Sequence, residues 1–139
     1  MSCILRAGGE NFEVEKFIEQ NSMKPDSFWK KGDRCFSNSN TNFKLNETSG
    51  IRVLVSEADF SELPQQIEDA ILFFAKHKSE IVKLTSFQGV EDIDLDFGTE
   101  AHQTRWSSFT FPPQLMLLVG TLGVSLCISI YPFDEELVM

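Results

Sequence analysis

Apolar and acidic residues alternate between residues 90 and 97, in the second half of the chain, and the alternation is strict over 92–97. In a β-strand, this alternation places three carboxylates on one face and three apolar side chains on the other. The carboxylates are Asp92, Asp94 and Asp96, and the apolar residues are Ile93, Leu95 and Phe97. The apolar face predicts contact with a core. The acidic face predicts contact with water, a cation or a basic partner, because a row of like charges is unfavourable elsewhere.

Similar patterns predict further elements on both sides of this strand. Short strands are expected at 3–7, 28–29, 51–55, 109–111 and 124–131. A first helix is expected to start at Asn11 as its N-cap and to end before residue 21. The strongest helix signal covers 63–84, where apolar residues recur every three or four positions and lysines crowd the far end. Pro112 and Pro113 open a short apolar helix that Gly123 closes.

This order of elements, with one polar sheet face, predicts an α+β fold. We expect a largely antiparallel, twisted sheet with two to three helices packed mainly on one face, as a two-layer sandwich. The 139 residues fit a single domain over 1–139, since a chain of this size can bury its own core. Residues 37–49 are expected to form a flexible polar loop, and 134–139 a frayed acidic tail.

Charge is distributed unevenly along the chain. The net charge is −9, and residues 53–139 contain fourteen acidic but only four basic side chains. Such a surface repels nucleic acid and anionic lipid and attracts basic proteins, so we expect no nucleic-acid or membrane partner. No apolar stretch approaches the ~20 residues that span a bilayer, and the first residues do not resemble a signal peptide. The expected location is therefore the cytoplasm.

Chemical motifs are scarce. The sequence contains no phosphate-binding glycine loop, zinc-protease motif or nucleophile elbow, so no catalytic residue and no cofactor is assigned. The three cysteines lack metal-ligand spacing and are expected to be free thiols. The aspartate row, with Glu100 and His102 downstream, is the one candidate for a metal or acid/base site, although alternate strand residues lie ~6.6 Å apart.

Several short motifs resemble a bacterial family catalogued as a domain of unknown function, number 4279. They are the opening strand with Gly8, the helix around 12–18, the Lys-Lys-Gly-Asp turn at 30–33, and the ending from Pro113 to Tyr131. The resemblance implies a bacterial cytosolic domain and transfers no catalytic residue. The aspartate row departs from the pattern associated with the family.

Three hypotheses of function follow. The leading one is an acidic protein that binds a basic protein, such as an immunity protein that inhibits a toxin or nuclease. Its expected binding residues are Glu91, Asp92, Asp94, Asp96, Glu100, Arg105 and Trp106. The second is a small-molecule or divalent-metal site, with enzymatic activity left open, built on the aspartate row. The third is an oligomerising domain that packs through the face carrying Ser125, Cys127, Ser129 and Tyr131.

Overall fold

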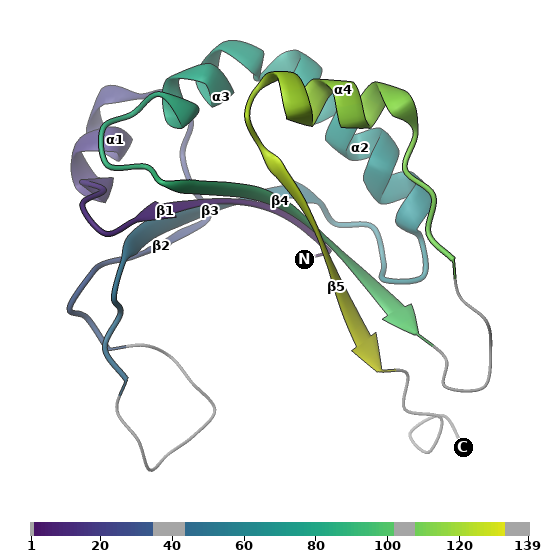
Figure 1. Cartoon of the computed structure of the whole chain (residues 1–139), viewed down its shortest axis with the longest axis horizontal. Coiled ribbons are helices and arrows are strands. Elements are labelled where there is room, and N and C mark those ends of the chain that lie inside the picture. The colour runs from purple at the N-terminus through teal and green to yellow at the C-terminus, as the bar shows by residue number, and fades with distance from the viewer. Residues whose placement is uncertain (1, 35–43, 102–107, 133–139) are drawn as a thin grey trace.

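The computed structural model describes residues 2–34, 44–101 and 108–132 (Figure 1). Within these ranges the chain forms five strands and four helices. In order they are β1 (Cys3–Gly9), α1 (Val14–Gln20), β2 (Ser27–Trp29), β3 (Ser49–Ser56), α2 (Leu63–Lys76), α3 (Lys78–Thr85), β4 (Asp92–Ala101), α4 (Pro113–Thr121) and β5 (Ser125–Pro132). No helix in the described ranges is both long and apolar enough to cross a bilayer.

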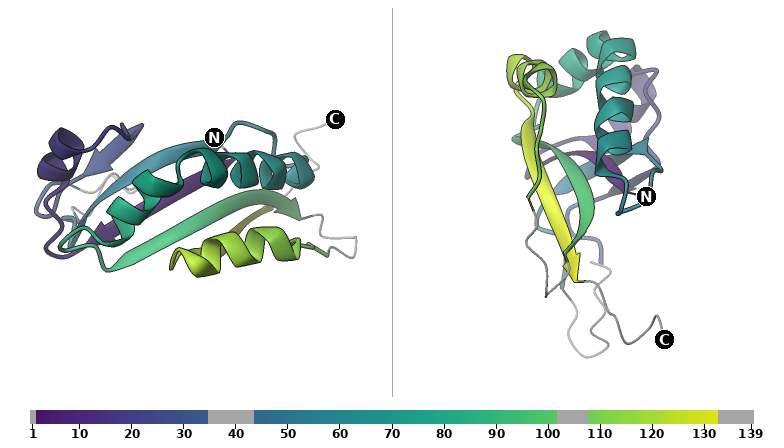
Figure 2. Two further views of the ribbon diagram at one scale, coloured as in Figure 1. Left: turned by 90° about the horizontal axis from the view of Figure 1, so that it is seen from above. Right: turned by 90° about the vertical axis from the view of Figure 1, so that its right-hand side faces the viewer.

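The five strands form one sheet in the order β2-β3-β1-β4-β5. Neighbouring strands are antiparallel except β4 and β5, which are parallel. The helices lie on one side of the arched sheet and leave its other side without a helix (Figures 1 and 2). The predicted α+β class, with a largely antiparallel sheet and helices on one face, is confirmed, with one helix more than expected.

The core lies between the sheet and the helices. The apolar half of each alternating strand faces it, and Leu5, Ile51, Leu95 and Phe97 are fully buried. Phe17, Phe74 and Ile81 close the core from the helix side and are equally inaccessible. Because each such side chain stabilises the fold by about 1.5–3 kcal/mol on burial, the apolar face of β4 is structural and only its other face is free for function.

The long helix predicted over 63–84 is interrupted at His77. The N–H of His77 donates to the Phe73 carbonyl as the last bond of α2, and the His77 carbonyl accepts from the N–H of Ile81 in α3. Both Phe74 and Ile81 remain buried across the break. The chain therefore changes direction at His77, and the two short helices follow the curved sheet. One straight helix would diverge from it.

Two smaller expectations are wrong. Phe109 and Phe111 do not form a strand; they lie in an irregular segment before α4, where both side chains pack against the core. Asn11 does not cap α1, because the residue before the helix is Glu13 and no side chain caps it. In both places tertiary packing of aromatic side chains outweighs the local signal.

The polar loop expected at 37–49 lies partly outside the described residues. Within its last residues, Leu45 forms a β-bridge with Arg34, and the Asn46 N–H donates to the Asp33 carbonyl (2.8 Å). Ser49 already belongs to β3. The tail at 134–139 and Cys35 also lie outside the described residues.

Candidate functional site

β4, which carries the aspartate row, lies inside the sheet between β1 and β5. The antiparallel register with β1 pairs Asp94 with Arg6 and Asp96 with Ile4. Since Ile93, Leu95 and Phe97 are buried under the helices, the alternating aspartates point to the helix-free side. The sequence predicted this orientation, but it did not predict the cation opposite the row.

The side chain of Arg6 bridges two of the three aspartates. Its Nε and Nη2 donate to Asp94 Oδ1 at 3.1 and 3.0 Å, and Nη2 also donates to Asp96 Oδ2 at 2.7 Å. The planar guanidinium provides several donors in a rigid arrangement, which suits it to hold two carboxylates at once. The middle of the row is therefore partly compensated within the protein, with one positive charge shared by two carboxylates.

Asp96 is the most buried carboxylate of the row. Its side chain is 11% exposed, against 31% for Asp94, while Asp92 is exposed. The hydroxyl of Ser129 on β5 donates to Asp96 at 2.8 and 2.9 Å. A buried carboxylate with both a cation and a hydroxyl partner is satisfied internally and offers little to a ligand.

The pKa values of neighbouring groups reflect this network. Burial alone would lower the pKa of Arg6, but the charge and hydrogen bond of Asp94 and the charge of Asp96 raise it above its usual value. Burial raises the pKa of the Cys127 thiol on β5, and the charges of Asp96 and Asp94 raise it further. This thiol is therefore protonated at neutral pH and is a weak nucleophile.

The same geometry bears on the metal-site hypothesis. Within the described ranges, no group of three His, Cys, Asp or Glu side chains is arranged to hold a metal ion. A cation bound between Asp94 and Asp96 would have to displace the guanidinium of Arg6. His102, expected as a further ligand downstream of the row, lies outside the described residues.

The remaining predicted site residues are dispersed. Glu91 and Asp92 are exposed at the start of β4, where Glu91 Oε1 accepts the backbone N–H of Glu10 (3.1 Å). Glu100 lies near the other end of the strand, close to Ala101. Arg105 and Trp106 lie outside the described residues. The structure therefore separates the predicted row into a paired centre and two ends.

The end of β4 that carries Glu100 is joined by acidic residues that the sequence analysis did not single out. The loop between β3 and α2 contributes Glu57, Asp59 and Glu62, all exposed. The loop is tied to β4, because the Thr99 hydroxyl donates to the Phe60 carbonyl (3.2 Å). We call these four carboxylates, Glu57, Asp59, Glu62 and Glu100, the acidic sheet end.

Aromatic side chains accompany the acidic sheet end. The ring of Phe60 lies 4.9 Å from the ring of Tyr131 on β5, measured between centroids. It also covers Gly98, where an added Cβ would lie 2.7 Å from the Phe60 ring. Tyr131 is 48% exposed, so the pair presents aromatic surface to solvent beside the carboxylates.

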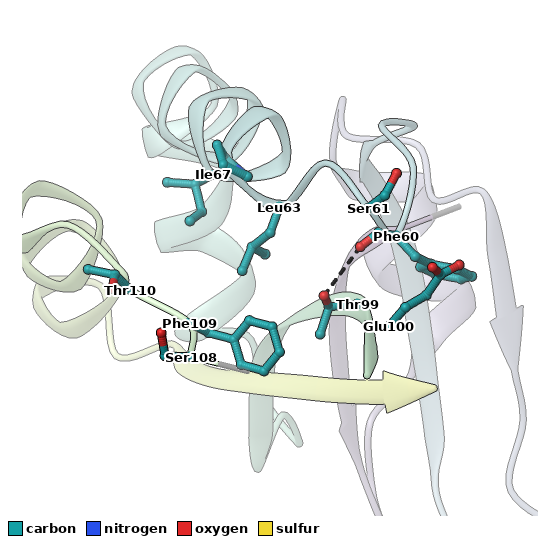
Figure 3. A pocket seen from close by; sticks show the side chains of 10 residues that line it. Phe60, Ser61, Leu63, Ile67, Thr99, Glu100, Ser108, Phe109 and Thr110 are labelled. Atoms are coloured by element: carbon teal, nitrogen blue, oxygen red, sulfur yellow. Dashed lines mark hydrogen bonds between the residues drawn. The ribbon is translucent and has the colours of Figure 1, made fainter. Parts of the chain in front are cut away.

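A cleft of about 460 Å³ opens at this end of the sheet. Figure 3 shows the Phe109 ring and the Leu63 side chain facing the cleft, with the Glu100 carboxylate beside Phe60. Ser61, Ser108 and Thr110 add hydroxyl groups to its lining. Glu100 is the one charged residue among the described residues that line it, so the cleft favours a cationic group over an anionic one.

The opposite end of the helix-free face has a different character. The Trp29 side chain on β2 lies against Gly50, where an added Cβ would lie 2.1 Å from its ring. The Arg52 guanidinium lies 4.4 Å from the Trp29 ring centroid. Nearby, Lys31 forms an ion pair with Glu10 (3.2 Å), so charges of both signs meet here. This end lacks the single sign that characterises the acidic sheet end.

Comparison with known proteins yields one match. No curated protein and no solved structure matches this chain. The model of a family described as a domain of unknown function, DUF4279, matches residues 1–133. The resemblance stated from the short motifs is thereby confirmed, and the chain belongs to the DUF4279 family.

Proposed function

We propose that this protein binds a basic protein through the acidic sheet end, as an immunity protein binds the toxin that it inhibits. In this proposal the docking surface consists of Glu57, Asp59, Glu62 and Glu100, with Phe60 and Tyr131 beside them. The protein is bacterial and cytoplasmic, and the toxin is a nuclease or another protein rich in exposed Lys and Arg.

The observation that carries the proposal is the contrast between two sets of carboxylates. Asp94 and Asp96 share one internal cation, Arg6. Among the described residues, by contrast, no Lys, Arg or His forms an ion pair with any carboxylate of the acidic sheet end. Like charges that repel one another without internal compensation favour a partner that supplies the opposite charge.

The surrounding surface suits a protein partner. Aromatic residues are enriched at the centres of protein interfaces, because they bury a large apolar area and keep few rotamers. The Phe60–Tyr131 pair and the cleft beside it provide such an anchor next to the charges. A lysine or arginine of the partner can place its aliphatic stem against the rings and its charge near Glu100.

This arrangement provides a mechanism of inhibition. A nuclease contacts phosphates with Lys and Arg side chains, and those side chains make its surface basic. Carboxylates that pair with them occupy the positions that nucleic acid needs. Complementary charge also steers the encounter, so association is fast at low ionic strength and slows as salt screens the field.

Differential capture from the native cell tests this function. We expect wild-type protein to retain a basic polypeptide, and a charge-reversed variant of the acidic sheet end to lose most of it. The variant combines Glu57→Lys, Glu62→Lys and Glu100→Lys. Mass spectrometry of the retained polypeptides is the measurement, and the retained amount should fall by about tenfold or more.

A second variant serves as the matched control. Glu13→Lys, Glu19→Lys and Glu47→Lys change the net charge by the same amount on exposed residues far along the chain from β4. This variant should retain the partner almost as well as wild type. Equal losses in both variants would mean that only total charge matters, and retention of no basic polypeptide by wild type would contradict the proposed function.

A further inference from the structure

One long segment of this acidic protein carries no charge. Residues 106–133 contain no Asp, Glu, Lys, Arg or His, although the chain as a whole has a net charge of −9. The described part of this segment contains α4 and β5. Surface elements of a monomeric protein ordinarily carry charged side chains, so a neutral helix and strand in such a chain require an explanation.

α4 and β5 lie together at one edge of the molecule. β5 is the last strand of the sheet, and among the described residues it pairs with β4 alone. Figure 2 shows α4 and β5 at the same edge, α4 on the helix side of the sheet. Large apolar side chains are exposed on both elements: Met116 is 50%, Leu117 71% and Ile130 53% exposed.

The two edges of the sheet differ sharply. β2 forms the other edge with only three residues, and Asp26 and Lys30 flank it. A short strand flanked by charges is a typical protection against pairing with other chains. β5 has eight residues, no charge and a single proline at its last position. Its outer N–H and C=O groups are therefore available to a further strand.

We propose that two copies of this chain pair antiparallel through their β5 edges, around a two-fold axis, and form one continuous ten-stranded sheet. Identical acidic chains repel one another wherever charged surfaces meet. Self-association therefore requires a neutral surface, and the β5 edge with α4 beside it is the neutral surface that this chain offers.

Antiparallel pairing also keeps the acidic sheet ends apart. Glu100 pairs with Tyr131 near the end of β5, so in an antiparallel pair the two acidic sheet ends lie at opposite ends of the shared strands. At about 3.3 Å per residue, eight residues separate them by about 25 Å, well beyond the screening length of about 8 Å at physiological salt. The four carboxylates of the acidic sheet end lie on β4 and on the loop before α2, outside the shared β5 edge, so this inference does not rest on the proposed function.

Sedimentation velocity of the purified chain, over about 1–200 µM, tests the pairing. We expect wild type to sediment as a dimer at the upper concentrations and Ile130→Lys to raise the dimer dissociation constant by about tenfold or more, because each introduced lysine then places an uncompensated charge against the neutral partner strand. Val82→Lys is the matched control, since Val82 is also an exposed β-branched residue (44%) but lies on α3. It should dimerise like wild type.

Amide hydrogen exchange of the wild type provides a second readout that needs no variant. Outward-facing β5 amides should exchange more slowly at high protein concentration, while β2 amides should be unaffected. A monomer at every concentration would overturn the proposal and would leave the β5 edge to a strand of another protein. A dimer whose β5 amides exchange independently of concentration would overturn it as well.

Discussion

Replacing Arg6 by alanine is expected to lower the free energy of unfolding by about 3 kcal/mol. Arg6 is the cation that holds Asp94 and Asp96, and its removal leaves an 11%-exposed Asp96 side chain beside a second carboxylate without compensation. Breaking a buried ion pair costs about 3–5 kcal/mol, and the partial exposure of Arg6 and Asp94 places this case at the lower end. Urea unfolding of the wild type and the Arg6→Ala variant at neutral pH measures the difference.

Two comparisons separate loss of the ion pairs from loss of packing. Arg52 is opposite Arg6 in the register of β1 and β3, but it stacks on Trp29 and forms no ion pair with a described residue. Arg52→Ala should therefore cost about 1 kcal/mol or less. Adding Asp96→Asn to Arg6→Ala should raise the free energy of unfolding again by more than about 1 kcal/mol. The asparagine amide keeps a hydrogen bond with Ser129 but carries no charge. If Arg6→Ala and Arg52→Ala lowered the free energy of unfolding equally, the stabilising role of the ion pairs between Arg6 and the two aspartates would be refuted.

Gly9→Ala is expected to destabilise the protein by a similar amount, about 3 kcal/mol. A Cβ at Gly9 would lie 1.9 Å from the backbone oxygen of Gly89 and 3.1 Å from the backbone nitrogen of Glu91. These atoms belong to the turn that leads into β4, and Glu91 N–H also donates to the Gly8 carbonyl (2.9 Å). Because backbone cannot rotate away as a side chain can, either β1 or the turn must move. Thermal and urea unfolding measure the loss.

Gly120 provides the matched substitution for this prediction. It lies in α4, and an added Cβ would meet nothing within 4 Å. Gly120→Ala should therefore stabilise the protein by about 0.5–1 kcal/mol, because alanine loses less conformational freedom in a helix. If Gly9→Ala lowered the free energy of unfolding no more than Gly120→Ala, the result would contradict the close approach of β1 to the turn before β4.

Local patterns were sufficient for much of the fold. The alternation over β4 predicted the strand and the face that each side chain takes, since both depend only on a period of two. The break at His77 was not predictable in this way. The apolar spacing continues from Phe74 to Ile81 through the break, and the bend follows the curvature of a sheet formed by distant strands.

The candidate site depends on strand order, which local patterns do not contain. Arg6 lies 88 residues from Asp94 in sequence, and they meet only because β1 pairs with β4. Likewise Glu57, Asp59 and Glu62 join Glu100 because Thr99 binds the Phe60 carbonyl across the sheet end. The count of charges in residues 53–139 predicted an acidic surface, but it did not predict that Arg6 pairs with Asp94 and Asp96 in the middle of the aspartate row.

The most direct test of the account is the association rate of the captured basic partner with wild type and with the charge-reversed variant of the acidic sheet end. Stopped-flow measurements at low and high salt compare both with the control that carries Lys at positions 13, 19 and 47. We expect the charge-reversed variant to associate about tenfold or more slowly than wild type and control at low salt, and the three rates to converge near 1 M salt. Equal rates for the two variants at low salt would contradict this expectation.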